Sequence, residues 1–520
     1  MPFMKTLASH FTVIAPDTPG YGLSDQVALD EPCPPIDIFA DAIADFMDTI
    51  GIEKAGVYGF HTGSAIGLKL AIRHPEKVSC LVINGSSLLN EAEREDFLAN
   101  YLVPFRPSWD GSHLSWLWAR LREQQMFFPW HQRTVANRMD HDMPSPDKLH
   151  QDLLHWLRAG DNYRIAYGAA FAYDKVRDIP SVQVPMTFLC GQQDPLSKYL
   201  QRLPDLPKHI STEIMNTQSD ALDRATNVFK RHLGGPAIAA AEVPKPIRGR
   251  TWGHFAYLDE GEIRLRMNDE AEGRPVFVLH DAAGSSALVD PVTRSLVGRR
   301  PVYAPDFPGN GDSDSLIGED NVTVSEYARM LGRIIDSLGI EEVDLYGMWG
   351  GGLVALELSI QRPALVRNVI MSNVIHHDSQ ESERLQENYT PDFQPDWYGG
   401  YLLRAWHYMR DQGLFWPWFD KSRQGIIWRE PFIDTEMIHQ RVVDLLKAGS
   451  MYAHAYRAHF SYRTGDKLKE TQVPTYIWTV SWDPNFEHTK SAAAEAGVPL
   501  HILPDDWSKW GPALLEKLSN

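Results

Sequence analysis

The sequence of 520 residues has few of the features that mark secreted, membrane-spanning or nucleic-acid-binding proteins. Its three cysteines, Cys33, Cys80 and Cys190, are widely separated, which fits neither a disulfide framework nor a metal-binding motif. No apolar run reaches the roughly 18 to 20 residues that cross a bilayer, and Met1–His10 lacks a secretory pattern. The net charge of −18, without any run of Lys or Arg, argues against a nucleic-acid surface. We therefore expect a cytoplasmic protein with no metal, cofactor, nucleic acid or membrane partner.

The chain repeats its own motifs at a nearly constant spacing. The pattern Ala-Pro-Asp-x-Pro-Gly-x-Gly-x-Ser-Asp begins at residue 15 and again at residue 304, and Phe-x-Pro-Trp begins at 127 and again at 415. Chance does not keep such a register, so we predict two copies of one domain, at residues 1–234 and 250–520. Residues 235–249, rich in Pro, Gly and Ala, are the predicted linker.

Apolar periodicity alternates between strand and helix within each half. For the first half it predicts helices at 36–50 and 64–73, and strands at 11–15, 55–58, 78–84, 186–190 and 212–215. Short buried strands separated by helices favour a mostly parallel α/β sheet with helices on both faces. A long aromatic helical insert interrupts each half, at about 108–173 and about 396–462.

The two halves differ at their starts. The second half has three expected strands, at 253–259, 262–268 and 275–280, before its Ala304 motif. The first half has only about fourteen residues before the same motif, so its N-terminal strands are missing. If the strand order is the same, one strand is lost between the 12–15 and 55–58 strands, which would leave backbone groups unpaired. We expect either a truncated start or another segment that fills the gap.

One stretch of the first half describes a strand that turns sharply into a helix. Val57–Gly67 reads as an apolar run, a Gly-x-x-x-Gly turn and an amphipathic segment. This is the shape of a nucleophile elbow, which lifts one side chain above a parallel sheet, next to free helix N–H groups. His61 holds that position here, and Trp349 holds it in a second such turn at Leu345–Gly352.

Taken together, these motifs resemble the α/β-hydrolase superfamily, twice and over almost the whole chain. Two further motifs contribute: an Asp-Pro pair after a late strand in each half, at Asp194 and Asp483, and the loop His280-Asp-Ala-Ala-Gly-Ser-Ser286. The loop is similar to the family's His-Gly oxyanion loop, with Asp281 in place of glycine. The resemblance implies two tandem domains, each with the aromatic insert as a cap, but it does not specify a reaction.

Catalysis in this family needs a nucleophile, an acid, a histidine and oxyanion donors. The resemblance assigns the acid position to Asp194 and Asp483, although an Asp-Pro pair can also simply shape a turn. The family's histidine is absent, because residues 216–220 and 504–508 contain none. Trp349 has only an N–H donor, so we expect the second copy, with His280 and Asp281 at its oxyanion loop, to be inactive or to shape a cavity.

His61 leaves three interpretations open. It could be a general base, an unusual nucleophile, or an inert polar residue in a disused pocket. A helix N-terminus disfavours the imidazolium, which suits a base, and Asp194 could pair with it directly. The cap would then close an aromatic-lined pocket over a flat or apolar small molecule. The substrate-binding candidates are Thr62, His113, Trp118, Tyr163 and Tyr167.

The leading hypothesis is hydrolysis of a small apolar or aromatic ester, amide or C–C substrate by the first copy. The alternatives are a non-catalytic ligand-binding or scaffold protein and a lyase that uses His61 as its base. The sequence leaves the substrate open, and it leaves a homo-oligomer open as well.

Overall fold

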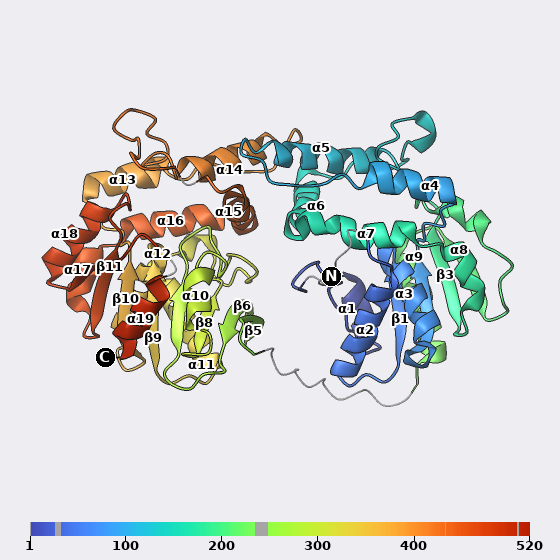
Figure 1. The fold of residues 1–520 in the computed structure, drawn as a ribbon, viewed down its shortest axis with the longest axis horizontal. Helices are drawn as coiled ribbons and strands as arrows, with labels where there is room; N and C mark the ends of the chain where they lie inside the picture. The colour runs from blue at the N-terminus through green and yellow to red at the C-terminus, as the bar shows by residue number, and fades with distance from the viewer. Residues whose placement is uncertain (1, 26–32, 235–247, 432, 507–508, 520) are drawn as a thin grey trace. The chain divides into compact units, whose positions relative to one another are not determined.

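The computed structural model describes residues 2–25, 33–234, 248–431, 433–506 and 509–519. The chain divides into two compact units (Figure 1). The first comprises Met1–Arg106 and Trp116–Lys245, and the second comprises Pro107–Ser115 and Pro246–Asn520. The short segment Pro107–Ser115, which the sequence analysis places in the first cap, therefore belongs to the second unit. The predicted linker falls outside the described residues, except for Arg248 and Gly249.

The first unit contains a four-stranded, wholly parallel sheet in the order β1-β2-β3-β4. Its strands are β1 (Ala55–Phe60), β2 (Val78–Asn84), β3 (Met186–Gly191) and β4 (Ile210–Met215). Its helices are α1 (Pro2–Ala8), α2 (Asp37–Thr49), α3 (Thr62–Arg73), α4 (Glu91–Asp96), α5 (Ser112–Met126, whose first residues belong to the second unit), α6 (Pro146–Ala159), α7 (Tyr163–Ala172), α8 (Lys175–Asp178) and α9 (Gln218–His232).

The alternation of side chains along these strands explains why helices cover both faces of the sheet. Cys80 and Val82 on β2 face a cluster formed with α9 and α1. Leu81, between them, faces α3, where Gly67 lets the helix approach: a Cβ on Gly67 would lie 3.0 Å from the Leu81 side chain. Each fully buried aliphatic side chain contributes roughly 1.5–3 kcal/mol to folding. The helices predicted at 36–50 and 64–73 are confirmed as α2 and α3.

The predicted strand at residues 11–15 is wrong. These residues form no strand in the structure, although Phe11 and Val13 pack against the cluster under α9. A strand needs a neighbour for its N–H and C=O groups, and the sheet ends at β1. Among the described residues, no segment pairs with the free edge of β1, so the predicted gap-filling segment is not seen there.

The second unit contains an eight-stranded mixed sheet in the order β12-β11-β10-β9-β7-β8-β6-β5, in which β6 is antiparallel to both of its neighbours. Its strands are β5 (Trp252–Leu258), β6 (Gly261–Asn268), β7 (Val276–Leu279), β8 (Val302–Pro305), β9 (Val343–Met348), β10 (Val366–Ser372), β11 (Thr475–Thr479) and β12 (Leu500–Ile502). Its helices are α10 (Asp290–Leu296), α11 (Val324–Ser337), α12 (Gly350–Gln361), α13 (Ser379–Asn388), α14 (Gly400–Asp411), α15 (Thr435–Ala448), α16 (Met451–Ser461), α17 (Thr464–Glu470), α18 (Phe486–Ala496) and α19 (Trp510–Ser519).

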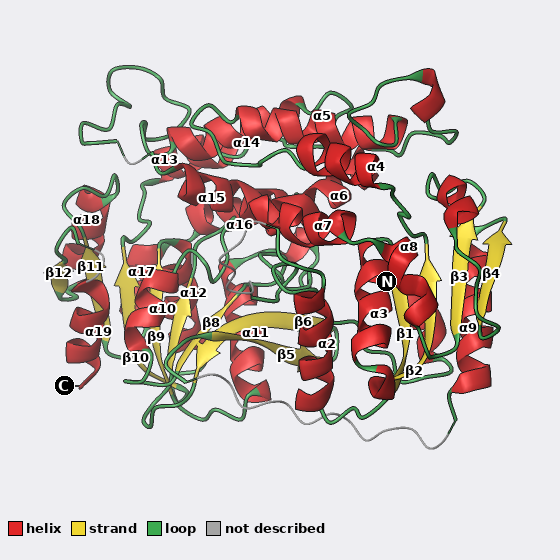
Figure 2. Cartoon of the chain, turned by 45° about the vertical axis from the view of Figure 1, so that its right-hand side comes forward, coloured by secondary structure: helices red, strands yellow, loops and turns green. Residues whose placement is uncertain are grey.

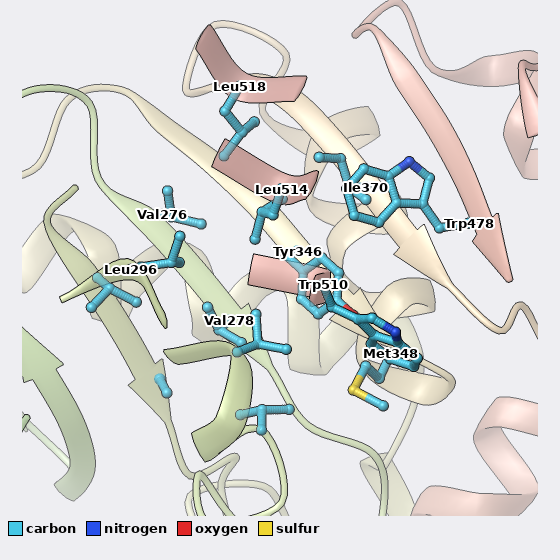
Figure 3. Close-up of a cluster of buried hydrophobic side chains, with 14 of the residues drawn as sticks. Val276, Val278, Leu296, Tyr346, Met348, Ile370, Trp478, Trp510, Leu514 and Leu518 are labelled. Carbon is cyan, nitrogen blue, oxygen red and sulfur yellow. The ribbon is translucent and has the colours of Figure 1, made fainter. Parts of the chain in front are cut away.

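The core of the second unit lies between this sheet and the helices α10 and α19. Figure 3 shows Trp510 and Leu514 of α19 against Tyr346 and Met348 of β9. The three strands predicted ahead of the Ala304 motif are confirmed as β5, β6 and β7. The first sheet has no counterparts of these three strands among its described residues. Its order β1-β2-β3-β4 matches that of β9, β10, β11 and β12 in the second sheet.

Within each unit the carboxyl ends of the strands that run parallel to one another point toward the helices of the aromatic insert. Figure 2 shows this for α6 and α7 in the first unit and for α14, α15 and α16 in the second. Functional residues at the carboxyl ends of parallel strands therefore face the insert, which is where binding sites of open α/β sheets lie. The predicted α/β class, with mostly parallel strands and helices on both faces, is confirmed.

Candidate functional site

The turn after β1 places His61 at the carboxyl end of the first sheet. β1 ends at Phe60 and α3 begins at Thr62, so His61 is the single residue between them. Its φ of 47° and ψ of −106° lie where non-glycine residues are rarely found. A Cβ on Gly59 would lie 2.3 Å from the carbonyl oxygen of Gly63, so the turn requires glycine there. The strand-turn-helix that the sequence predicts is present.

His61 lies against a carboxylate from the end of another strand. Its Nε2 is 3.2 Å from Oδ2 of Asp194, which follows β3. The backbone N–H of Leu196 donates to the other oxygen, Oδ1, at 2.8 Å and so holds the carboxylate in place. The Phe60 ring stacks on the imidazole with centroids 3.8 Å apart. The turn and the loop after β3 thus bring together the two residues assigned to catalysis.

Gly85, which sequence reasoning missed, provides the space for this pair. It follows β2 directly and has a φ of 65°. A Cβ there would lie 2.6 Å from Cδ2 of His61 and 2.8 Å from Oδ2 of Asp194. Its N–H donates to the carbonyl oxygen of Leu189 at 3.0 Å, and this bond connects the end of β2 to β3. Any larger residue would push the histidine and the carboxylate apart.

The arrangement can accept a proton and stabilise a nearby negative charge. An ionised carboxylate only accepts hydrogen bonds, so a neutral His61 bonded to Asp194 carries its proton on Nε2 and has a free lone pair on Nδ1. The His61 side chain is 42% exposed, so a small molecule can reach it. Thr62 and Gly63 stand in the first turn of α3, where backbone N–H groups have no intrahelical acceptor and attract anions.

The corresponding turn of the second unit carries Trp349. It lies between β9 and α12 with a φ of 45° and a ψ of −116°. Its indole N–H donates to Oδ2 of Asp483 at 3.1 Å, and the N–H of Asn485 donates to Oδ1 at 2.7 Å. Burial raises the pKa of Asp483, and both donors act in the opposite direction. An indole offers no lone pair for a proton, so this pair cannot perform the proton transfer that His61 can.

A side chain of the protein itself occupies the N-terminus of α12. The N–H of Gly350 donates to Oδ1 of Asp281 at 2.9 Å. The imidazole of His459, on α16, lies 3.5 Å from the same oxygen and is 3% exposed. A Cβ on Gly350 would lie 2.0 Å from His459. The position that a substrate oxyanion would need is therefore filled by a fixed carboxylate. The sequence did not reveal His459, because its position in a helix does not indicate a contact with a loop as distant in the chain as that of Asp281.

His280 has a structural place in the same loop. Its Nδ1 donates to the carbonyl of Asp281 at 2.6 Å, and its Nε2 accepts the N–H of Phe307 at 2.9 Å. Burial lowers the pKa of His280, which favours the neutral ring that these two bonds require. Both ring nitrogens are engaged by backbone groups, so the ring holds two loops together.

The comparison with known sequence families agrees with this geometry. A sequence model of the alpha/beta hydrolase fold matches residues 1–219 and 274–405, which together exceed half of the chain. The chain belongs to the alpha/beta hydrolase fold family. The first matched segment lies in the first unit except for Pro107–Ser115, and the second lies in the second unit. Together they include both strand-turn-helix sites.

Relatives of known name in this family match shorter stretches. The chain is 28% identical over 117 residues to haloalkane dehalogenase 2 of Mycobacterium tuberculosis, which is 22% of this chain and 41% of that protein. It is 40% identical over 84 residues to 2-hydroxymuconate semialdehyde hydrolase of Pseudomonas sp. strain CF600, which is 16% of this chain and 29% of that protein. The matched stretches thus span less than half of these relatives. The enol-lactonase from Burkholderia xenovorans LB400 is 17% identical, with a TM-score of 0.40, over 51% of this chain and 98% of that one.

In the first unit, the segment after β4 where a histidine of this family would be expected is the start of a helix. Thr217 caps α9: its hydroxyl accepts the N–H of Asp220 at 3.2 Å, and its own N–H donates to Oδ2 of Asp220 at 3.0 Å. Thr217 and Asp220 therefore form the N-terminal cap of α9. His61 therefore takes the contact with Asp194 from the turn itself.

The cap residues assigned to substrate binding lie in different surroundings. Tyr163 is buried and donates its hydroxyl to the carbonyl of Val103. Tyr167 stacks on Trp156 with centroids 6.4 Å apart. Trp118 is buried in α5. Their substrate-binding roles, and that of Thr62 at the start of α3, stay predictions.

His113 packs inside the second unit. Its Nε2 is 3.2 Å from Nδ1 of His439 on α15, and its ring centroid is 4.8 Å from that of Trp406 on α14. Burial, followed by the charge of His439, lowers the pKa of His113 to about 3. Because the segment Pro107–Ser115 belongs to the second unit, the structure does not bring His113 into the first unit with His61.

The described residues offer neither a metal-binding group nor a helix that could cross a membrane. In the described parts of the chain, no group of three or more His, Cys, Asp or Glu side chains could hold a metal ion. None of the helices described is both long enough and apolar enough to span a bilayer. Burial raises the pKa of Cys190 to about 12, so this thiol next to the Asp194 loop is not a ready nucleophile.

Proposed function

We propose that the first unit hydrolyses a small apolar or aromatic ester, amide or C–C substrate, with His61 in place of the usual serine nucleophile. The observation that carries this proposal is the 3.2 Å contact between His61 Nε2 and Asp194 Oδ2. It joins a partly exposed imidazole to a held carboxylate next to the N-terminus of α3. The names of the relatives, a haloalkane dehalogenase and a 2-hydroxymuconate semialdehyde hydrolase, support hydrolytic chemistry.

In the proposed reaction, His61 acts as a general base. Its Nδ1 takes a proton from a water molecule while the water oxygen attacks the substrate carbonyl carbon. The N–H groups of Thr62 and Gly63 stabilise the oxyanion that forms. Asp194 stabilises the imidazolium, which then gives its proton to the leaving alcohol, amine or carbon. No covalent intermediate is needed on this route.

Two other routes use the same residues. His61 could attack the carbonyl directly and form an acyl-imidazole, or it could remove a substrate proton as the base of a lyase. The intact protein mass during turnover separates these routes, because only the first adds an acyl group to the enzyme. A small-molecule-binding protein without turnover is the third outcome.

We further propose that the two units are tandem copies and that the second is catalytically inactive. Matching details support the repeat: Trp130 donates its indole N–H to the Tyr101 carbonyl at 3.1 Å, and Trp418 does the same to Tyr389 at 2.8 Å. The inactivity rests on Trp349, which accepts no proton, and on the carboxylate that fills the N-terminus of α12. The second unit would then serve as a binding or scaffold module.

A panel of p-nitrophenyl esters, aryl amides and 1,3-diketones tests the proposal on the full-length chain. We expect turnover of at least one class, with a loss of about 10²–10⁴-fold in His61→Ala and a large loss in Asp194→Asn. Asp483→Asn, the matched change in the second unit, should leave the rate unchanged. Turnover that survives in His61→Ala, or ligand binding without any turnover, would overturn it.

A further inference from the structure

Arg120 is a buried cation without a counter-ion in the cap of the first unit. It lies on α5 and is 2% exposed. Its Nη1 donates to the side-chain oxygen of Gln124, one turn further along the helix. Its Nε and Nη2 have no hydrogen-bond partner, and no carboxylate pairs with it among the described residues. An unpaired charge in such a place is costly, so it calls for an acceptor.

Aromatic rings surround the guanidinium on several sides. The ring centroids of Trp156, Trp130 and Tyr101 lie 4.5, 4.9 and 5.2 Å from its central carbon. The faces of these rings attract a cation and offset part of its lost hydration. The ring faces accept no strong hydrogen bond, and although the Tyr101 hydroxyl interacts with the Arg120 side chain, Nε and Nη2 stay without a partner. Tyr167, which stacks on Trp156, extends the apolar wall.

The two free donors are the pair that suits a carboxylate. Nε–H and Nη2–H lie on the same edge of the planar guanidinium and point in parallel, which matches the two oxygens of a carboxylate group. We propose that the Arg120 cluster (Arg120, Tyr101, Trp130 and Trp156) is a binding site for a small carboxylate with a flat or apolar body. The carboxylate pairs with the free edge of Arg120, and the body packs against the rings.

The second unit provides an internal comparison. Tyr408, 288 residues after Arg120 in the sequence, stands in α14 in place of the arginine. The cation near Tyr408 is Arg441 on α15, whose Nη2 donates to the side-chain oxygen of Gln412 at 2.6 Å. The tryptophan beside it is kept: Trp418 lies 5.1 Å from Tyr408, centroid to centroid. Both caps therefore hold a cation near their rings, but an arginine at this position of the helix is particular to the first cap.

Calorimetric titration of the full-length protein with benzoate and 3-phenylpropionate tests the site, with benzamide and 3-phenylpropionamide as neutral matches. We expect one of the carboxylates to bind the wild-type chain at least about tenfold more tightly than its amide. Arg120→Gln should abolish this preference. Arg120→Lys keeps the positive charge but loses the two parallel N–H donors of the guanidinium. This variant should therefore retain only part of the preference for the carboxylate over its amide.

Two further variants make the result decisive. Arg133→Gln removes a more exposed cation whose central carbon lies 6.0 Å from the Trp130 ring, and it should bind both carboxylates like the wild type. His61→Ala should also bind both carboxylates normally, so turnover that survives in His61→Ala would count against the proposed hydrolase but not against this site. The proposal is overturned if neither carboxylate binds below about 10 mM, or if Arg120→Gln and Arg120→Lys both keep the preference. A lower melting temperature of Arg120→Gln, without any carboxylate binding to the wild type, would instead show an arginine that only stabilises the fold.

Discussion

Trp349 donates its indole N–H to Asp483 at 3.1 Å, and this bond stands where the first unit has the contact between His61 and Asp194. Both turn residues have nearly the same backbone angles, with φ values of 45° and 47°. The same backbone site therefore carries a proton acceptor in one unit and a side chain that can only donate in the other.

Trp349→Phe should destabilise the second unit by about 1–3 kcal/mol near neutral pH, because a buried carboxylate loses a donor. Burial already raises the pKa of Asp483 and the indole N–H opposes that shift, so the pKa should rise further in the variant. A raised folded-state pKa means that stability falls as the pH rises. Urea unfolding at pH 5 and pH 7.5 checks this: the loss should be larger at pH 7.5, and an equal loss at both would contradict the account.

Gly85→Ala should separate His61 from Asp194. The new Cβ would overlap both side chains, and the positive φ adds strain of roughly 1 kcal/mol. We expect ester hydrolysis to fall at least about tenfold, to an extent set by how far the pair moves apart. The matched control is Gly51→Ala, where φ is 72° but no atom lies within 4 Å of the added Cβ. Gly51→Ala should have the same backbone strain and keep the activity. Equal activity in Gly85→Ala and Gly51→Ala would contradict a catalytic role of the contact between His61 and Asp194.

Asp444→Asn should stabilise the second unit in a pH-dependent way. Burial, helped by the charge of Asp306, raises the pKa of Asp444 to about 7 from an ordinary value of 3.8. Between these values the folded state holds a proton that the unfolded chain has released, so stability falls as the pH rises through this window. The variant lacks that loss, because an amide does not titrate.

The free energy of unfolding of Asp444→Asn should be close to that of the wild type near pH 4. Above pH 7 it should be larger than that of the wild type by on the order of 1–4 kcal/mol. Denaturant unfolding across this range measures it. Asp466→Asn, a change at a side chain that is 60% exposed on α17, should show no such trend. A variant less stable than the wild type at pH 8 would mean that Asp444 is needed in its ionised form.

Most of the fold could be predicted from local patterns. Alternating apolar runs located β2 at Val78–Asn84 to the residue, because a buried parallel strand is a short uninterrupted apolar segment. The strand at 11–15 failed for a reason that no local pattern contains: Phe11 and Val13 are apolar, but no neighbouring strand is there to pair with them.

The site was only half predictable. Motif spacing located His61 and Asp194, and the fold brings them together because both follow parallel strands that end at the same edge. Gly85 could have been suspected, since a glycine directly after a buried strand often marks a close approach. The contacts of His459 with Asp281, and of Arg120 with its rings, depend on how cap helices pack, which spacing along one helix does not specify. The same limit explains why His113, assigned to the first cap, packs with His439 in the second unit.

The central claim is that His61 accepts a proton during turnover, and His61→Gln tests it most directly. A glutamine amide can still donate a hydrogen bond to Asp194, but it has no nitrogen lone pair to take the proton. For an ester that the wild type hydrolyses, kcat/KM should fall by about 10²-fold or more, with the melting temperature unchanged and with Asp483→Asn at the wild-type rate. A His61→Gln enzyme that keeps kcat/KM within about threefold of the wild type would contradict the claim.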